Sequence, residues 1–329
     1  MNWNGRLVLV TGAGGFIGSH LVERLVELGA RVRCFVRYTS QADVGLLRFV
    51  QPQAFKELEL VFGDLRDADA VRRAAAGCQT VFHLGALISI PYSYVHPHEV
   101  VEVNVLGTLN VLEAIRACDA ERLVHVSSSE VYGTARYTPM DESHPLQGQS
   151  PYSASKIGAD RLVESYWRSF KLPAVTVRPF NTYGPRQSAR AVIPTIITQA
   201  LTQDEVRLGN LHPTRDFTFV ADTVAGLIAA TQAKGVSGQE INLGSDHEIT
   251  VGDLAQKIIA MVGRPVQVVT EEVRQRPLSS EVDRLWADNR KAKRLIGWSP
   301  QIGLDEGLQI TLAWIKEHLD LYRPGVYEI

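Results

Sequence analysis

Short apolar runs alternate with longer amphipathic stretches along the first half of the chain. The short runs are rich in Val, Leu, Ile and Phe, as in strands buried on both faces, and the stretches between them repeat apolar residues at helical spacing. This pattern predicts an α/β fold with a doubly wound parallel sheet, and six strands fit a Rossmann-type arrangement. The predicted strands span 7–11, 32–36, 58–62, 80–83, 123–127 and 174–178, and the predicted helices 16–28, 68–76, 100–118 and 152–170.

The regular alternation ends after Arg178, where residues 181–190 are rich in Pro, Gly and Arg. We therefore expect a Rossmann domain over 1–180 and a smaller C-terminal α/β substrate domain over 181–329, with later segments returning to the first sheet. Beyond residue 190 the pattern predicts helices over 192–201, 220–233, 251–262 and 304–319, and short strands over 206–208, 240–243 and 266–270.

Composition narrows the class of protein. Of the 329 residues, 45% are hydrophobic and 21% charged, which excludes a disordered, collagenous or coiled-coil chain. The net charge of −2 argues against nucleic acid or an anionic membrane as partner. Three widely spaced cysteines predict neither a metal site nor a redox pair, and no apolar segment approaches the ~18 residues of a membrane span. We expect a cytoplasmic protein without a metal.

A glycine-rich loop follows the first predicted strand and precedes the first predicted helix. Strand, tight turn and helix are what the diphosphate of a dinucleotide requires, because glycine lets the backbone approach the phosphates at a helix N-terminus. The spacing is GxxGxxG rather than GxGxxG, since Ile17 stands where the last glycine of the latter would be. The predicted cofactor-binding residues of this loop are Gly12, Gly15, Phe16, Ile17 and Gly18.

The second strand ends in Arg37 instead of the acidic residue that would hold the ribose of NAD. A guanidinium matches phosphate geometry, so Arg37, with Arg33 near it, favours NADP, and NAD stays possible. The alternative for Arg37 is an ordinary solvated arginine. Asp64, followed by Leu65 at the end of the third strand, is a candidate contact for the adenine edge, or else a turn or capping aspartate.

Tyr152 and Lys156 stand four residues apart and therefore share one face of a helix that begins near Pro151. A phenol with a pKa near 10 needs roughly 3 units of depression, about 4 kcal/mol, to act as a base near pH 7. A nearby ammonium together with an oxidised nicotinamide can supply that depression. The pair alone is common by chance, but here it accompanies a glycine loop and the strand end at 127–133.

At this point the chain resembles the extended short-chain dehydrogenase/reductase family, specifically its nucleotide-sugar epimerases and dehydratases. The resemblance covers nearly the whole sequence in one ordered series of motifs. They are TGAGGFIG at 11–18, GDL at 63–65, HLGA at 83–86, NVLGTLNVLEA at 104–114, SSSEVYG at 127–133, YSASK at 152–156, RPFNTYGPR at 178–186, RDFTFVAD at 215–222 and ADNRKAKRLIGWSP at 287–300.

The resemblance implies roles for individual residues. Ser128, Tyr152 and Lys156 match the catalytic triad of the family. Ordinary surface or inter-domain charge is the alternative for the predicted arginines. Cofactor-side support is implied for Leu84, Ala86 and Asn104, and contact with the nucleotide diphosphate for Asn181, Arg186, Arg215 and Arg276.

Glu130 indicates which reaction the resemblance implies. In the family's 4,6-dehydratases and in a decarboxylase branch, a glutamate stands two positions after the catalytic Ser or Thr, whereas the epimerases lack an acid there. A 4-keto intermediate acidifies the C5 proton, and a carboxylate is needed to remove it while the C6 hydroxyl leaves as water. Ser129 stands where some dehydratases carry an aspartate, a pattern similar to GDP-mannose dehydratases. The alternative is a Glu130 that pairs with an arginine.

A narrower resemblance points to GDP-N-acetylglucosamine 4,6-dehydratases and places Ser89 and Tyr92 against the hexose, in the loop after the fourth strand. The expected substrate is a GDP- or UDP-linked N-acetylglucosamine. A 4-epimerase and a uronic-acid decarboxylase stay open, as does a non-catalytic dinucleotide-binding regulator. The resemblance also implies a homodimer formed by helices 100–118 and 152–170.

Overall fold

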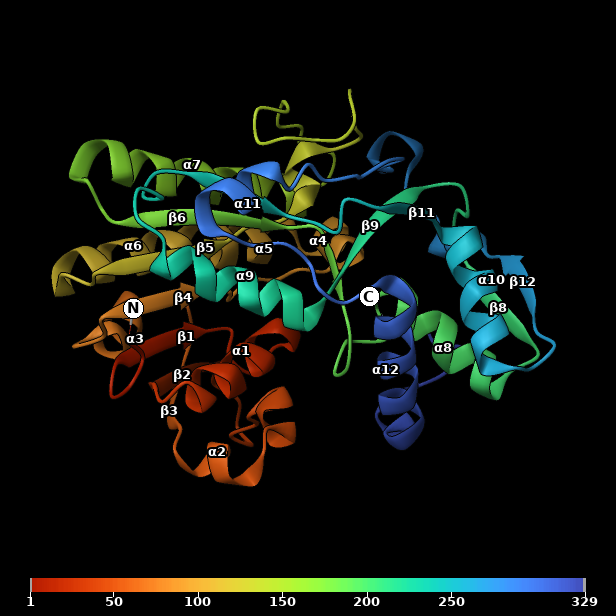
Figure 1. Cartoon of the computed structure of the whole chain (residues 1–329), viewed down its shortest axis with the longest axis horizontal. Helices are drawn as coiled ribbons and strands as arrows, with labels where there is room; N and C mark the ends of the chain where they lie inside the picture. Colours follow the sequence, from red (N-terminus) through yellow and green to blue (C-terminus); the bar gives the residue numbers. More distant parts are fainter. Residues whose placement is uncertain (1, 328–329) are drawn as a thin grey trace.

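The large sheet of the computed structural model, which describes residues 2–327, contains seven parallel strands in the order β10-β6-β5-β4-β1-β2-β3 (Figure 1). Met1, Glu328 and Ile329, at the outer ends of the two predicted domains, lie outside the described residues. The Rossmann-type α/β prediction is confirmed. The strands are β1 Leu7–Thr11, β2 Arg31–Arg37, β3 Glu59–Gly63, β4 Thr80–His83, β5 Arg122–Val126, β6 Ala174–Pro179 and β10 Glu240–Leu243.

The seventh strand comes from the second half of the chain. β10 pairs with β6 in parallel, Ile241 beside Val177, so the chain returns to the first sheet after leaving it near residue 180. The exact division into two domains at residue 180 stays a prediction.

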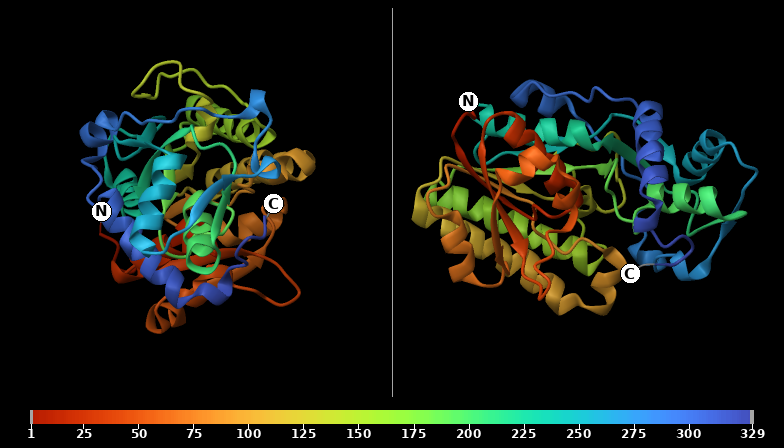
Figure 2. Two further views of the ribbon diagram at one scale, coloured as in Figure 1. Left: turned by 90° about the vertical axis from the view of Figure 1, so that its right-hand side faces the viewer. Right: turned by 90° about the horizontal axis from the view of Figure 1, so that it is seen from below.

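Helices cover both faces of the large sheet, which explains the continuous apolar runs of its central strands. On one face α1 contacts α9, which in turn contacts α11, and on the other α6 contacts α3 and α7 (Figures 1 and 2). The bounds are α1 Phe16–Glu27, α9 Val220–Gln232 and α11 Arg290–Ile296 on the first face, and α3 Ala68–Ala75, α6 Gly107–Cys118 and α7 Pro151–Phe170 on the second.

The helix predicted over 100–118 is divided. It starts as α5 (Pro97–Val101), passes through a π-helical turn over Glu102–Leu106 and continues as α6. Such turns often occur at functional positions, and this one contains the buried Asn104. Two short helices, α2 (Pro52–Lys56) and α4 (Ile90–Val95), have no counterpart in the predicted pattern.

A second region lies beyond one end of the large sheet (Figure 1). It contains a three-stranded sheet in the order β11-β9-β7 and a parallel pair β12-β8. The hydrophobic pattern missed β7, β9 and β11, because they are short or interrupted by polar residues. The strands are β7 Asn181–Tyr183, β8 Glu205–Leu208, β9 Thr214–Phe219, β11 Glu248–Thr250 and β12 Gln267–Thr270, and the helices α8 Val192–Thr202, α10 Val251–Val262 and α12 Leu304–Glu317.

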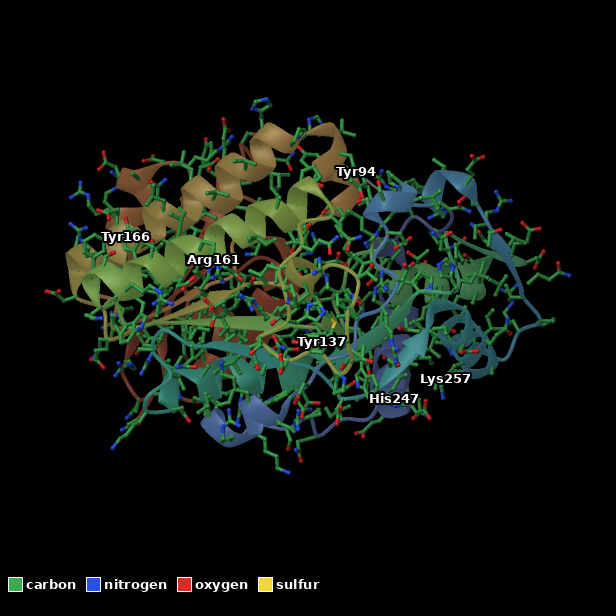
Figure 3. The ribbon with its side chains drawn as sticks, turned by 90° about the horizontal axis from the view of Figure 1, so that it is seen from above. Tyr94, Tyr137, Arg161, Tyr166, His247 and Lys257 are labelled. Atoms are coloured by element: carbon green, nitrogen blue, oxygen red, sulfur yellow. The ribbon has the colours of Figure 1, made fainter. Side chains whose placement is uncertain are left out.

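Segments far apart in the sequence tie the two regions together. Tyr94, at the end of α4, shares a hydrogen bond of 2.6 Å between its hydroxyl and that of Ser280 (Figure 3). Met140 and Ala287, also far apart in the sequence, form an isolated parallel β-bridge. Among the described residues, no helix has both the length and the apolar character needed to cross a membrane.

Candidate active site

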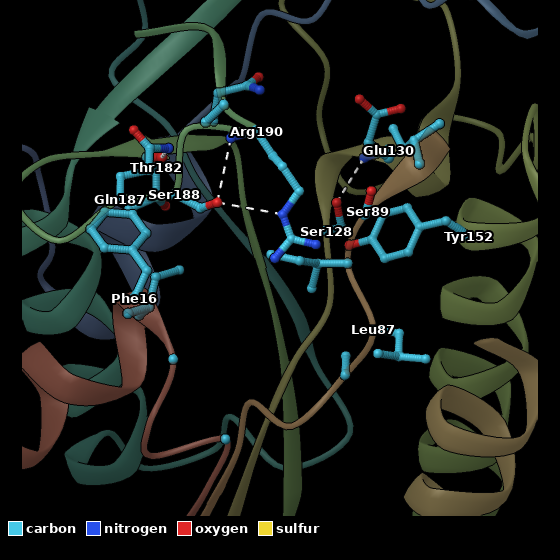
Figure 4. Close-up of a pocket in the computed structure, with 18 of the residues that line it drawn as sticks. Phe16, Leu87, Ser89, Ser128, Glu130, Tyr152, Thr182, Gln187, Ser188 and Arg190 are labelled. Atoms are coloured by element: carbon cyan, nitrogen blue, oxygen red, sulfur yellow. Dashed lines mark hydrogen bonds between the residues drawn. The ribbon is translucent and has the colours of Figure 1, made fainter. Parts of the chain in front are cut away.

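A cavity of ≈ 870 Å³ lies where strands of the large sheet end and the second region begins (Figure 4). In parallel sheets ligands bind at these carboxyl ends. The structure brings nineteen of the predicted site residues to its wall: Gly12, Gly15, Phe16, Ile17, Gly18, Arg37, Asp64, Leu65, Leu84, Ala86, Ser89, Ser128, Ser129, Glu130, Tyr152, Lys156, Asn181, Arg215 and Arg276.

The glycine loop forms a cradle of bare backbone at the start of α1. Gly12 has a φ of +71°, and a Cβ there would lie 2.7 Å from the backbone nitrogen of Gly85. A Cβ at Gly18 would lie 2.2 Å from the carbonyl oxygen of Gly12. Only glycine fits at these two positions, and the N-terminus of α1 faces the cavity with free N–H groups. The residues present therefore fit the diphosphate of a dinucleotide cofactor.

Arg37 lies at the cavity wall with 65% of its side chain exposed, and its Nη2 is 3.3 Å from Glu99 Oε1. Its guanidinium can therefore meet a phosphate, in competition with Glu99. Arg33 does not accompany it, contrary to the prediction. Arg33 instead donates to the carbonyl oxygen of Ala74 at 2.7 Å and pairs with Glu59 at 2.8 Å.

Asp64 also lies at the wall, but its carboxylate is engaged by Arg66, whose Nη2 is 2.7 Å from Oδ2. The hydrogen bonds from Arg66 hold the pKa of Asp64 below its ordinary value. Asp64 also accepts the backbone N–H of Arg66 at 2.9 Å, as a turn aspartate does.

The start of α7 fixes the Tyr152–Lys156 pair. Ser150 caps the helix by accepting the Ser153 backbone N–H at 3.1 Å, and Pro151 occupies the first helical position. Tyr152 and Lys156 follow in the first turns with both side chains buried. Because the cap defines the first residue of the helix, it also fixes where Tyr152 and Lys156 lie relative to the end of β5.

Burial dominates the acid–base properties of this pair. It raises the pKa of Tyr152 to about 12, although the neighbouring Ser128 hydroxyl favours the phenolate. Burial lowers the pKa of Lys156 to about 8, and its Nζ donates to the carbonyl oxygen of Val126 at 2.9 Å. The Ser128 hydroxyl is the group in the protein that lowers the pKa of Tyr152, and the further fall expected from the sequence requires the positive charge of an oxidised nicotinamide together with Lys156.

Ser128 and Glu130 follow β5 at the cavity wall, and Ser128 lies beside the Tyr152 hydroxyl (Figure 4). The Glu130 backbone N–H donates to Ser128 Oγ at 3.2 Å, which fixes the turn over Ser129–Tyr132. Ser129, between them, is buried. The Glu130 carboxylate lies 3.6 Å from Arg276 Nη1. Glu130 therefore lines the cavity, as the predicted base must, and also pairs with an arginine, as the alternative interpretation expects.

Charged side chains from the second region form an opposite wall. Arg215 Nη2 and Arg276 Nε lie 3.6 Å and 4.0 Å from the same oxygen of Glu281, whose other oxygen accepts from Asn210 at 2.9 Å. Asn181 Oδ1, at the same cavity, is buried and has no hydrogen-bond partner among residues 2–327. The two arginines suit the diphosphate of a ligand. The Asn181 oxygen suits a neutral hydrogen-bond donor of the same ligand.

Arg186 does not reach this wall, so this arrangement does not support its predicted contact with the diphosphate. Its Nη2 pairs with Glu23 at 2.8 Å and donates to the carbonyl oxygen of Phe49 at 2.9 Å. The side chain joins the segment after β7 to α1, and no atom of it lines the cavity. Arg186, the last residue of the motif at 178–186, therefore makes structural contacts in this arrangement.

Two further predicted contacts also lie off the wall. The Tyr92 hydroxyl donates to Glu99 at 2.5 Å, and the ring packs on His96, because α4 turns this side chain away from the cavity. Asn104 lies behind the wall. Its amide donates to the carbonyl oxygen of Leu87 at 2.9 Å and accepts the Leu87 N–H at 2.8 Å. It supports a residue of the wall without lining the cavity itself.

Sequence reasoning missed Arg190 and Glu281. The Arg190 side chain extends into the cavity between Phe16 and Ser128 (Figure 4), with Nε donating to Ser188 Oγ at 3.4 Å. Within the described part of the chain its guanidinium forms no ion pair. Arg190 lies in an irregular segment, three residues after the sequence Gly-Pro-Arg-Gln, so neither helical nor strand periodicity indicated where its side chain would point. Across residues 2–327, no cluster of His, Cys, Asp and Glu is arranged to hold a metal ion.

Comparison with known proteins identifies chains similar to this one. The sequence profile described as GDP-mannose 4,6 dehydratase matches residues 9–311. The chain is 33% identical over 318 residues to a putative UDP-glucose 4-epimerase of Methanocaldococcus jannaschii, covering 95% of this chain and 99% of the relative. It is 30% identical over 328 residues to human dTDP-D-glucose 4,6-dehydratase, covering 94% and 90%.

A solved structure agrees with these relatives. DesIV, a dTDP-glucose 4,6-dehydratase from Streptomyces venezuelae solved with NAD bound, superimposes with a TM-score of 0.85 at 29% identity. The match covers 96% of this chain and 99% of that one.

Proposed function

The chain belongs to the GDP-mannose 4,6 dehydratase family of nucleotide-sugar dehydratases and epimerases, and we propose that it is a 4,6-dehydratase of a nucleoside-diphosphate hexose. The observation that carries this proposal is the carboxylate of Glu130 in the same cavity as Ser128, Tyr152 and Lys156. Epimerisation at C4 needs a phenol and a hydroxyl there, but no carboxylate. Elimination of water across C5 and C6 needs one.

The proposed chemistry assigns a proton to each side chain. A bound nicotinamide cofactor supplies a hydride acceptor that later returns the hydride, so the reaction has no net redox change. Tyr152 accepts the O4 proton, assisted by Ser128 beside it and by the charge of Lys156. Glu130 takes the proton from C5, and the C6 hydroxyl leaves as water with a proton delivered by Glu130 itself or through a water on Ser129. The hydride removed from C4 is added at C6, and C5 regains a proton that balances the one Tyr152 took from O4. The product is a 4-keto-6-deoxy sugar, and the only molecule lost is water.

For the cofactor we propose a preference for NADP. Arg37 is the cation at the end of β2, and Asp64, an acid of the same wall, is already paired with Arg66. Support for NAD comes from the DesIV structure, which has that cofactor bound. Clearly tighter binding of NAD than of NADP would remove Arg37 from this role.

For the substrate we propose a GDP- or UDP-linked N-acetylglucosamine, with its diphosphate on Arg215 and Arg276 and its hexose near Ser89. Arg190, which the sequence did not single out, supplies a further cation to the anionic ligand. The support is the donor set of the wall and the narrower sequence resemblance.

A 4-epimerase is the second candidate, because the relative of 33% identity carries that name. Incubation with UDP-, GDP- and dTDP-hexoses, followed by mass spectrometry, separates the reactions. Loss of one water supports the dehydratase, and an isomer of equal mass contradicts it. Loss of carbon dioxide from a uronate indicates the decarboxylase, with Arg190 as its carboxylate contact. Tight cofactor binding without any turnover would indicate a regulator.

Glu130→Gln tests the mechanism directly. This variant is expected to reduce the cofactor during the first half-reaction and to stop before water is lost. Glu281→Gln is the matched control, because it removes a carboxylate from the same cavity at a position with no assigned proton transfer. Dehydration by the Glu130 variant at the normal rate would show that Glu130 is not the base.

We also propose a homodimer formed through α5, α6 and α7. The apolar side chains of Val101 on α5, Leu106 in the π-helical turn and Phe170 at the end of α7 are 47%, 43% and 51% exposed. Exposed apolar side chains along these helices can be buried against a second copy. Sedimentation equilibrium gives the oligomeric state, and a monomer at micromolar concentration would contradict the proposal.

A further inference from the structure

A third polar residue continues the row of Tyr152 and Lys156 along α7. Asp160 follows Lys156 by four residues, as Lys156 follows Tyr152, so all three lie on the face of the helix that packs against the sheet. All three side chains are at most 6% exposed. A buried carboxylate one helical turn from a buried catalytic ammonium has no part in the proton transfers proposed above.

Asp160 is held by side chains from two strands of the sheet. Its Oδ2 lies 3.0 Å from both Nε and Nη2 of Arg178 on β6. Its Oδ1 lies 3.3 Å from Nε2 of His125 on β5. The next residue of β5, Val126, accepts the hydrogen bond from Lys156. Adjacent residues of one strand therefore contact Lys156 and Asp160, and these contacts set the register of α7 along β5.

The charges in this part of the interior do not balance without Asp160. Lys156 and Arg178 are buried cations, and burial lowers the pKa of His125, so that ring adds no charge at neutral pH. Glu240 Oε1 lies 4.0 Å from Arg178, at a position where 28% of the side chain is exposed. Asp160 is thus a fully buried carboxylate that contacts Arg178 directly and stands one helical turn from Lys156.

We propose that Asp160 is a positioning residue for the Tyr152–Lys156 pair, because it supplies the buried carboxylate that keeps Lys156 in its charged form against the end of β5. The role is indirect, since Asp160 touches neither the cavity nor a reacting atom. Its importance for turnover rests on the proposed function, whereas its effect on Lys156 does not.

The groups around Lys156 determine the sign of the effect. Burial lowers the pKa of Lys156 to about 8, and Asp160 is the group that raises it. Burial also keeps the nearby histidines neutral. The titratable and charged side chains that act on Lys156 are Asp160 on α7, His83 on β4 and His125 on β5, and Arg178 on β6 contacts Asp160 behind them.

Asp160→Asn removes the charge and keeps the shape of the side chain. We expect the pKa of Lys156 to fall by about one unit or more, a tenfold change in the ratio of ammonium to amine. NMR titration of protein labelled with ¹³C at lysine Cε measures this value without cofactor or substrate, and Lys156→Arg assigns the resonance. Glu240→Gln is the matched control, because it removes the other carboxylate near Arg178, and it should leave the Lys156 resonance unchanged.

A second pair of variants covers the case in which Asp160→Asn does not fold. Arg178→Met removes the buried cation, and Asp160→Asn combined with Arg178→Met then leaves no unpaired charge at that site. The pKa of Lys156 in the double variant should lie below that in Arg178→Met by the same tenfold change. Equal values in these two proteins, or in wild type and a folded Asp160→Asn, would overturn the proposal.

Turnover gives a separate readout. In Asp160→Asn the alkaline limb of the kcat–pH profile should move to lower pH, so that activity is partly recovered in more acidic buffer. A uniform loss at every pH would show a merely structural role and overturn the proposal. If no nucleotide sugar is converted by the wild type, the proposed function fails, while the NMR titration still decides the effect of Asp160 on Lys156.

Discussion

The two walls of the cavity are built in different ways. The wall that holds Tyr152 and Lys156 consists of one helix and the ends of parallel strands, and both of these side chains are buried. The opposite wall gathers Arg215, Arg276 and Glu281 from β9 and from the chain between β12 and α11. The first wall positions single groups for proton transfer, and the second pairs opposite charges that an anionic ligand can rearrange.

This difference predicts different responses to substitution. In the first wall each reacting group has a single fixed position, so removing one such group should stop turnover and leave ligand binding nearly unchanged. In the second wall, neighbouring charges share partners, so removing one arginine should weaken ligand binding and leave part of the site intact.

Removal of the Tyr152 hydroxyl should have the largest effect. Tyr152→Phe is expected to lower kcat on the order of a thousandfold or more, because the group that moves the O4 proton is lost. Cofactor binding, followed by fluorescence, should stay within a factor of a few of wild type. Turnover that survives in this variant would place the base elsewhere and break the comparison.

The glycine cradle should be the next most sensitive feature. Gly18→Ala is expected to weaken cofactor binding on the order of a hundredfold, about 2–3 kcal/mol, because the new Cβ overlaps the Gly12 carbonyl oxygen. Titration calorimetry with NADP and NAD measures the effect. Gly303→Ala is the control, since a Cβ there meets no atom within 4 Å. Equal losses in the two variants would show a general effect on stability.

A pair of arginines sharpens the comparison between a ligand contact and a structural contact. Arg215→Met should weaken binding of a nucleoside diphosphate by about tenfold to a hundredfold, since hydrogen bonds to charged groups contribute about 1.5–3 kcal/mol. Arg186→Met should leave that affinity unchanged and lower the free energy of unfolding by about 1–3 kcal/mol, because Glu23 loses its partner. Calorimetry and urea unfolding test both. The reverse result would restore Arg186 as a ligand contact.

The smallest expected effect is on the pH dependence of stability, and it comes from His20 on α1, the helix that follows the glycine loop. Burial lowers the pKa of His20 to about 4, although its contact with the Pro185 carbonyl oxygen at 3.0 Å opposes the shift. Protonation therefore favours the unfolded chain, and stability present above pH 6.5 is lost as the pH falls toward 4.

In His20→Gln, the loss of unfolding free energy between pH 7.5 and pH 5 should be about 1–2 kcal/mol smaller than in wild type. Urea unfolding at the two pH values measures it. His247→Gln, at an exposed position (Figure 3), is the control and should behave as wild type. The same slope in all three proteins would contradict the assignment to His20.

Local patterns predicted the wall made of regular elements. The apolar runs predicted six strands of the sheet, and the spacing of Tyr152 and Lys156 predicted their common helical face. The prediction failed where a side chain's direction depends on a distant partner. Arg186 carries the same charge as Arg215, yet Glu23 draws it to α1. Tyr92 stands in the expected loop, but α4 directs its hydroxyl to Glu99.

The sequence by itself determined the sheet, the glycine cradle and the Tyr152–Lys156 pair, because each depends on residues close together in the chain. Only the tertiary structure decided which arginines face the cavity, that Glu130 meets Arg276, and that Asp160 lies among His125 and Arg178. These contacts join segments distant in sequence, and a buried charge takes whichever partner the packing of the strands and helices places within reach.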